Sequence, residues 1–305
     1  MDLYKVTSLS PELLAEIRSL HFQTRHLVDQ GVTGQYRSAF RGRGIEFEEV
    51  RPYHPGDDVR AIDWKVTARM NTPFIKSYRE ERELTVMVAV DVSASTFTGT
   101  RAQLREQLIA RVGAVLTLIA LNNNDRVGLT TFSNRLETYH PPRKGRSSVW
   151  RILQEVLTTG NANPGTDLGA MCTFLSGVLK RRSIVFLISD FVSPAPFEQP
   201  LATLAKRHDV TAVIVRDRAD TELPKAGLIC IREPESGEIH LVDSQNARVQ
   251  TQYQELAKKA RADQTTMFER NRVSTLELLT ELPFMPELGR FLERRGKTTV
   301  RARLG

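Results

Sequence analysis

Four apolar runs, each bounded by turn-forming or charged residues, recur in the middle of the chain. They are LTVMVAV at 84–90, VGLTTF at 127–132, IVFLIS at 184–189 and VTAVIV at 210–215. Short runs rich in apolar and β-branched residues are typical of parallel strands that helices cover on both faces. The pattern therefore predicts a buried, mostly parallel sheet.

Helical patterns of apolar residues fill the intervals around these runs, at 104–119, 149–157, 168–179 and 201–206. Strands that alternate with helices form right-handed βαβ units. The sequence thus predicts an α/β fold with a doubly wound, mostly parallel sheet flanked by helices, over about residues 84–217.

The two ends of the chain have a different pattern. Residues 10–28 predict an amphipathic helix, and 45–51 and 74–78 predict short strands, so 1–83 reads as an extension of helix and short strands. After the sheet, PESGE separates two apolar runs at 228–231 and 239–242, as in a hairpin. These boundaries divide the chain into 1–83, 84–217 and 218–305.

The final segment predicts further helices after the hairpin. Helical patterns run from Val249 to about Ala262 and recur around Leu276. Pro283 and Pro286 are expected to break this pattern before a last helix at 288–294.

Composition limits the classes of protein that fit. With 305 residues and 40% apolar content the chain can bury a substantial core, and its longest apolar run, 112–121, is too short for the roughly 20 residues of a membrane span. Cys172 and Cys230 lie in apolar patterns that suit buried free thiols. Because no secretory leader is evident, we expect a cytoplasmic protein without a membrane span.

The net charge of +7 raises the question of nucleic acid. Lys and Arg are mostly interleaved with Asp and Glu, and the basic stretches at 143–146 and after Glu293 contain no aromatic residues for stacking on bases. We therefore interpret these stretches as solvated faces and do not expect nucleic acid as a partner. Binding through a basic surface is kept as a third hypothesis for function.

Candidate chemistry lies where the predicted strands end. The first strand is followed by Asp91, Ser93 and Ser95, the loop NANPGTD places Thr166 before a helix, and the strand at 184–189 is followed by Asp190. Ligands of open parallel sheets bind beyond the carboxyl ends of the strands. Hydroxyls and a few carboxylates suit Mg²⁺ or Mn²⁺ better than Zn²⁺, so the five residues predict a magnesium or manganese site.

The pattern DxSxS, followed by Thr and then Asp, resembles the metal-ion-dependent adhesion site of von Willebrand factor A domains. The resemblance implies a von Willebrand factor A-like fold and the metal ligands Asp91, Ser93, Ser95, Thr166 and Asp190, with a partner's carboxylate completing the shell. Adhesion receptors usually have glycine after the last aspartate, where this chain has Phe191. DVSAS could also be an ordinary turn that caps the next helix, which is the simpler structural interpretation.

The dense stretch RPYHPGDDVRAIDWKVTAR at 51–69 carries many acids and bases. No nucleophile, base and orienting group can be assigned in it, so we predict a scaffold of mutually paired charges. In this scaffold Asp57 or Asp58 caps a short helix, and Val59 and Ile62 face inward. A docking surface for a partner is the other interpretation. The chain also lacks the usual phosphate-loop, nucleophile-elbow and zinc-protease motifs, and we expect no enzyme.

Together with the upstream GRGIEFEEV and the downstream LPFMPELGRFLERR, this stretch resembles the bacterial domain of unknown function 58 family. That resemblance implies a partner ATPase of the MoxR AAA+ type and an unidentified client protein. The function expected is a metal-dependent adaptor in the assembly or activation of protein complexes. A metal-dependent hydrolase is the alternative.

Overall fold

The computed structural model describes residues 10–27, 33–40, 45–80, 83–93, 104–158, 165–232 and 238–304. The chain forms two compact units, one made of Met1–Phe40 and Thr85–Gly305 and the other of Arg41–Leu84. The three segments predicted from the sequence, 1–83, 84–217 and 218–305, were divided by their residue patterns, and that division stays a prediction.

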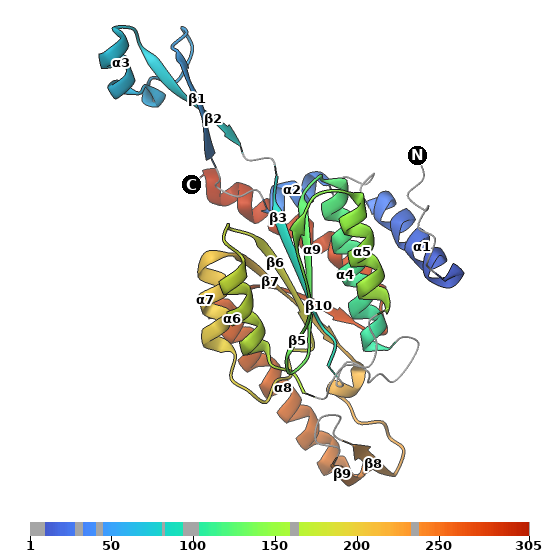
Figure 1. The fold of residues 1–305 in the computed structure, drawn as a ribbon. Helices are drawn as coiled ribbons and strands as arrows, with labels where there is room; N and C mark the ends of the chain where they lie inside the picture. The colour runs from blue at the N-terminus through green and yellow to red at the C-terminus, as the bar shows by residue number, and fades with distance from the viewer. Residues whose placement is uncertain are drawn as a thin grey trace. The chain divides into compact units, whose positions relative to one another are not determined.

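A six-stranded sheet lies at the centre of the larger unit (Figure 1). Its order is β10-β7-β6-β3-β4-β5, and every neighbouring pair is parallel except β4 and β5. The strands are β3 (Thr85–Asp91), β4 (Arg126–Phe132), β5 (Leu136–Arg143), β6 (Ile184–Ser189), β7 (Asp209–Arg216) and β10 (Ser274–Leu279). The predicted α/β class with a doubly wound, mostly parallel sheet is confirmed.

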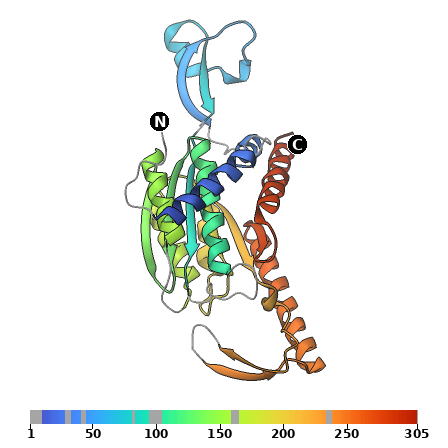
Figure 2. The same cartoon turned by 90° about the vertical axis from the view of Figure 1, so that its right-hand side faces the viewer.

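Helices cover both faces of this sheet (Figures 1 and 2). On one face, α6 (Leu168–Val178) and α7 (Glu198–Arg207) pack with the inward residues Met87, Ala89 and Leu187 in one apolar core. On the other, α4 (Arg105–Asn122) packs against Val90 and Ile188, beside α5 (Arg146–Thr158). Because successive residues of a buried strand point to opposite faces, the continuous apolar runs supply both cores.

The ends of the chain complete this unit. Helix α1 (Pro11–Leu27) packs on α4, and α2 (Thr33–Phe40) packs on α9 (Phe284–Leu304). The ring of Phe40 meets that of Phe186 in β6 edge to face, with centroids 5.4 Å apart. The predicted helix at 10–28 is confirmed as far as Leu27, and Val28 lies outside the described residues.

The C-terminal segment corrects two predictions. Leu276 lies in strand β10, which pairs with β7, and not in a helix. Pro286 stands in the first turn of α9, where a missing backbone N–H costs nothing, so this residue does not break the helix. The predicted hairpin is confirmed as β8 (Leu228–Arg232) and β9 (Ile239–Asp243), followed by the long helix α8 (Ala247–Arg270).

Both cysteines are free thiols, but only Cys172 is buried. Cys230 is exposed on the two-stranded hairpin, so the prediction that both thiols are buried is wrong for this residue. Within the described residues, no helix combines the length and the apolar content needed to cross a membrane.

The smaller unit is built on the antiparallel pair β1 (Ile45–Pro52) and β2 (Phe74–Glu80), with a short 3-10 helix η2 (Val59–Ala61) and helix α3 (Trp64–Met70) between them. The predicted charge pairing is present in part. Arg51 donates to both carboxylate oxygens of Asp57, over 2.9 and 2.8 Å, and this pairing lowers the pKa of Asp57 to about 2.

The other acids of the stretch cap backbone. Asp58 accepts from the Arg60 amide and caps η2, while Asp63 accepts from the first amides of α3. Val59 is 61% exposed, so the prediction that it faces inward is wrong, whereas Ile62 is half-buried and forms a β-bridge with Ile75. Trp64 is exposed as well. Most of the acids in this stretch are thus engaged in holding local backbone, which fits a scaffold.

Candidate metal site

The direction of the chain reverses next to β3. From β3 the chain passes through α4 to β4 on one side, and it later returns to β6 on the other side of β3. In open α/β sheets this switch point, at the carboxyl ends of the strands, is where ligands bind. Asp91 ends β3 and Asp190 directly follows β6, so both predicted carboxylates lie at the switch point.

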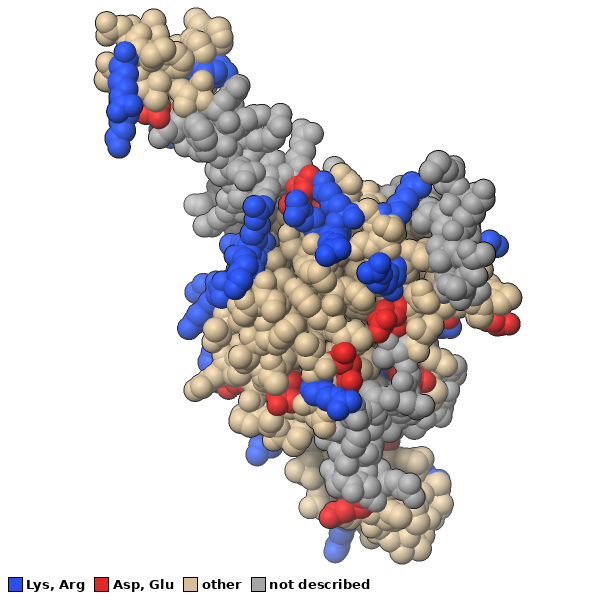
Figure 3. Space-filling model, in the orientation of Figure 1, with Lys and Arg blue, Asp and Glu red and all other residues tan. Residues whose placement is uncertain are grey.

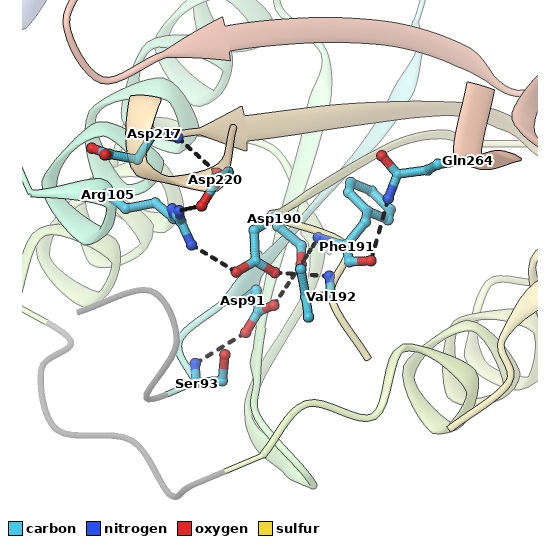
Figure 4. Close-up of polar contacts among 10 residues, drawn as sticks. Asp91, Ser93, Arg105, Asp190, Phe191, Val192, Asp217, Asp220 and Gln264 are labelled. Carbon is cyan, nitrogen blue, oxygen red and sulfur yellow. Dashed lines mark hydrogen bonds and ion pairs between the residues drawn. The ribbon is translucent and has the colours of Figure 1, made fainter. Parts of the chain in front are cut away.

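Asp91 is fully buried and accepts hydrogen bonds from two serines, Ser93 and Ser189 (Figure 4). The backbone N–H of Ser93 donates to Oδ1 over 3.0 Å, and the Ser189 hydroxyl donates to Oδ2 over 2.6 Å. Burial, and after it the charge of Asp190, raise the pKa of Asp91 to about 7. The shift marks a buried pair of like charges that a cation would stabilise.

Asp190 is 3% exposed and makes a charged pair. Its Oδ1 accepts from the Val192 amide over 2.9 Å, and its Oδ2 accepts from the Arg105 guanidinium over 2.9 Å (Figure 4). The next residue, Phe191, has a φ of 58°, a left-handed conformation that favours glycine. Phe191 therefore adopts a strained backbone conformation that glycine would adopt without strain.

Ser93 and Thr166 are both buried at this edge. The Thr166 carbonyl accepts from the Ser193 hydroxyl over 3.0 Å, and the amide of the next residue, Asp167, donates to the Ser133 carbonyl after β4. These contacts tie Thr166 to the loops that follow β6 and β4. Of the five predicted residues, four lie at the carboxyl edge of the sheet, and Ser95 lies outside the described residues.

One buried hydroxyl at this edge lacks a partner. Thr166 is 2% exposed, and its Oγ1 makes no hydrogen bond to any described residue. An unsatisfied buried hydroxyl costs about 1 to 3 kcal/mol, so such a group calls for a ligand. Its Oγ1 is thus available to a ligand. That this ligand is a metal ion stays a prediction from the sequence.

The donor chemistry fits a hard cation. Two carboxylates and the hydroxyls of Ser93 and Thr166 are oxygen ligands of the kind that Mg²⁺ and Mn²⁺ accept. Among the described residues, no three His, Cys, Asp or Glu side chains are grouped as if to hold a metal ion. A site here would depend on hydroxyls, water and an additional ligand, and the residues present fit Mg²⁺ or Mn²⁺ on these grounds.

Sequence reasoning missed three residues that shape the site. Ser189 bonds Asp91, and Arg105 bridges Asp190 and Asp220. A signal for Arg105 was present, because 105, 108, 112, 115 and 119 follow helical spacing and so place Arg105 on the buried face of α4. Its partners are 85 and 115 residues away, beyond the reach of local patterns.

Basic side chains gather at the amino ends of the parallel strands, opposite the candidate site. Exposed Lys180, Arg181 and Arg182 precede β6, and exposed Lys206 and Arg207 end α7. Figure 3 shows several Lys and Arg side chains gathered on the face of the larger unit seen there. The five residues named lie at the amino ends of strands whose carboxyl ends carry the candidate site. This group of five basic residues is therefore separate from that site.

Comparison with known proteins agrees with the sequence-based resemblance. Residues 49–263 match the family model described as protein of unknown function DUF58. The uncharacterized proteins Mb1516 of Mycobacterium bovis and Rv1480 of Mycobacterium tuberculosis are each 31% identical over 287 residues, which cover 93% of this chain and 90% of theirs.

Solved structures with a related chain path are more distant. A conserved hypothetical protein, BatB from Bacteroides thetaiotaomicron, is 15% identical, with a TM-score of 0.47 over 70% of this chain and 99% of that one. The SpRpn10 VWA domain is 12% identical, with a TM-score of 0.33 over 68% of this chain and 93% of that one. The match to the family model over more than half of the chain, and the mycobacterial relatives, decide the assignment: the chain belongs to the DUF58 family.

Proposed function

We propose that this protein is a metal-dependent protein-interaction adaptor. Asp91, Ser93, Ser95, Thr166 and Asp190 would hold Mg²⁺ or Mn²⁺, and a carboxylate of the partner would complete the shell of ligands. The observation that carries the proposal is the buried, unpartnered hydroxyl of Thr166 at the same sheet edge as the Asp91 and Asp190 pair. When bound, the cation would supply positive charge for the partner's carboxylate.

The surroundings favour binding over catalysis. No histidine of the described residues follows the carboxyl end of β3 or β6, where a base for attack on a substrate would be needed. The carboxylates present are buried and already accept hydrogen bonds from the chain. A metal-dependent hydrolase is the alternative, and turnover of phosphate or peptide substrates by the isolated chain would support it.

The partner proposed is an AAA+ ATPase of the MoxR type, which would supply the energy for remodelling a client protein. Support for this partner comes from the family resemblance. In such an adaptor, the metal ion bridges the chain and an exposed carboxylate of the partner. Removing the metal ion should therefore abolish the complex.

The test measures binding between the purified chain and the MoxR-type ATPase of the same host, with Mg²⁺ or with EDTA. We expect the complex to form with Mg²⁺, to be lost in EDTA, and to be lost in Asp91→Asn, which removes one metal ligand. Glu222→Gln is the matched control, because Glu222 is a carboxylate at the same edge, paired with Arg218 outside the site. A complex that survives both EDTA and Asp91→Asn would disprove the metal bridge.

A further inference from the structure

A buried arginine lies beside the candidate metal site. Arg105 begins α4 and is only 4% exposed. Its Nη1 donates to Asp190 Oδ2 over 2.9 Å, and its Nη2 donates to Asp220 Oδ1 over 2.6 Å (Figure 4). A fixed positive charge thus contacts one of the two carboxylates that would hold the cation.

The position of this charge is costly for the fold. A cation in the first turn of a helix opposes the helix dipole, and burying a guanidinium costs several kcal/mol unless it is paired. Asp190, directly after β6, and Asp220, in the 3-10 turn Arg218–Asp220 after β7, provide that pairing. Because burying the Arg105 guanidinium at the start of a helix is unfavourable in both respects, we infer that it has a role other than stabilising the fold.

The bridge is anchored beyond Asp220. Asp220 accepts from the Asp217 amide over 2.8 Å, and the Asp217 carboxylate accepts from the Thr280 hydroxyl over 2.7 Å, next to β10. Asp217 and Thr280 are both buried. Arg105 is therefore held between groups fixed to the sheet, and its charge stays close to Asp190.

We propose that Arg105 is a tethered counter-ion that weakens metal binding by the free protein. It offsets part of the Asp190 charge and occupies lone pairs of Asp190 Oδ2, while Asp220 shares the same guanidinium. Charge count tunes the affinity of oxygen sites for divalent cations, so Arg105 lowers the attraction of Asp91 and Asp190 for a cation. A partner's carboxylate adds negative charge beside the cation, so metal and partner bind together. This inference rests on the proposed function.

Titration calorimetry of the full chain with MgCl₂ and with MnCl₂ tests the inference without any partner. Arg105→Gln should bind either cation at least about tenfold more tightly than wild type, because it removes a unit charge close to the metal. Arg105→Lys keeps the charge and should bind within a few-fold of wild type. Arg111→Gln is the control, since Arg111 lies on the same helix but pairs with Glu16 at the surface.

A second variant, Asp220→Asn, should change the metal affinity in the opposite direction, and it leaves the Arg105 side chain in place. Asp220→Asn leaves the Arg105 charge to Asp190 alone, so cation affinity should fall several-fold. Equal or weaker binding by Arg105→Gln, or tighter binding by Asp220→Asn, overturns the counter-ion role while leaving the metal site in place. If neither wild type nor Arg105→Gln binds either cation, both this inference and the proposed function fail.

Discussion

Replacing Phe191 with alanine should lower the free energy of unfolding by about 3 to 5 kcal/mol, the usual cost of emptying a buried aromatic site. Phe191 is 4% exposed, and its ring meets that of Phe268 edge to face, with centroids 5.1 Å apart. Replacement with glycine should cost about 1 kcal/mol less than alanine, because only glycine adopts the φ of 58° without strain.

This order reverses the usual one and is measured by urea unfolding of both variants. Phe268 provides the control: it lies within α8, where glycine should be about 1 kcal/mol worse than alanine. If glycine is also the worse replacement at 191, the strain inferred from the left-handed backbone is absent. The expected order would show that the left-handed backbone at Phe191 is strained, and the loss common to both variants would measure the packing of its ring against Phe268 of α8.

Asp190→Asn should destabilise the metal-free protein by about 3 kcal/mol, because it leaves the buried Arg105 with one charged partner instead of two. Asp91→Asn should change stability by no more than about 1 kcal/mol, since it removes a buried like charge and the amide can keep neutral hydrogen bonds to Ser93 and Ser189.

Urea unfolding in EDTA separates the two substitutions. Each removes one carboxylate from the same edge of the sheet, so the pair serves as its own control. A larger loss of stability for Asp91→Asn than for Asp190→Asn would contradict the assignment of Asp190 as a charged partner that stabilises the buried Arg105.

The sequence predicted the strands whose residues are apolar on both faces and missed the two at the edges of the sheet. In β5, Pro141 and Pro142 look like a loop, yet an edge strand needs backbone donors on only one side and tolerates them. In β10, STLELL contains good helix formers, and parallel pairing with β7 decides its conformation. Long-range pairing of this kind leaves little local signal.

At the candidate site, the convergence of Asp91, Ser93, Thr166 and Asp190 followed from a general rule about strand ends. The electrostatic state of that site could not be predicted in the same way. It depends on Arg105, whose partners come from separate loops, and on burial that raises the pKa of Asp91 to about 7. Residue types therefore indicated the candidate ligands, while packing determines the charge that these side chains present.

The most direct test of the account is Mg²⁺ titration of Thr166→Val beside wild type. Valine keeps the shape of threonine and removes the unpartnered hydroxyl, so the variant should be about 1 kcal/mol more stable in EDTA and should lose Mg²⁺ binding at least about tenfold. Thr173→Val, whose hydroxyl already bonds the Gly169 carbonyl in α6, should bind Mg²⁺ like wild type. If Thr166→Val binds Mg²⁺ as tightly as wild type, Thr166 is not a ligand and the proposed metal site is wrong.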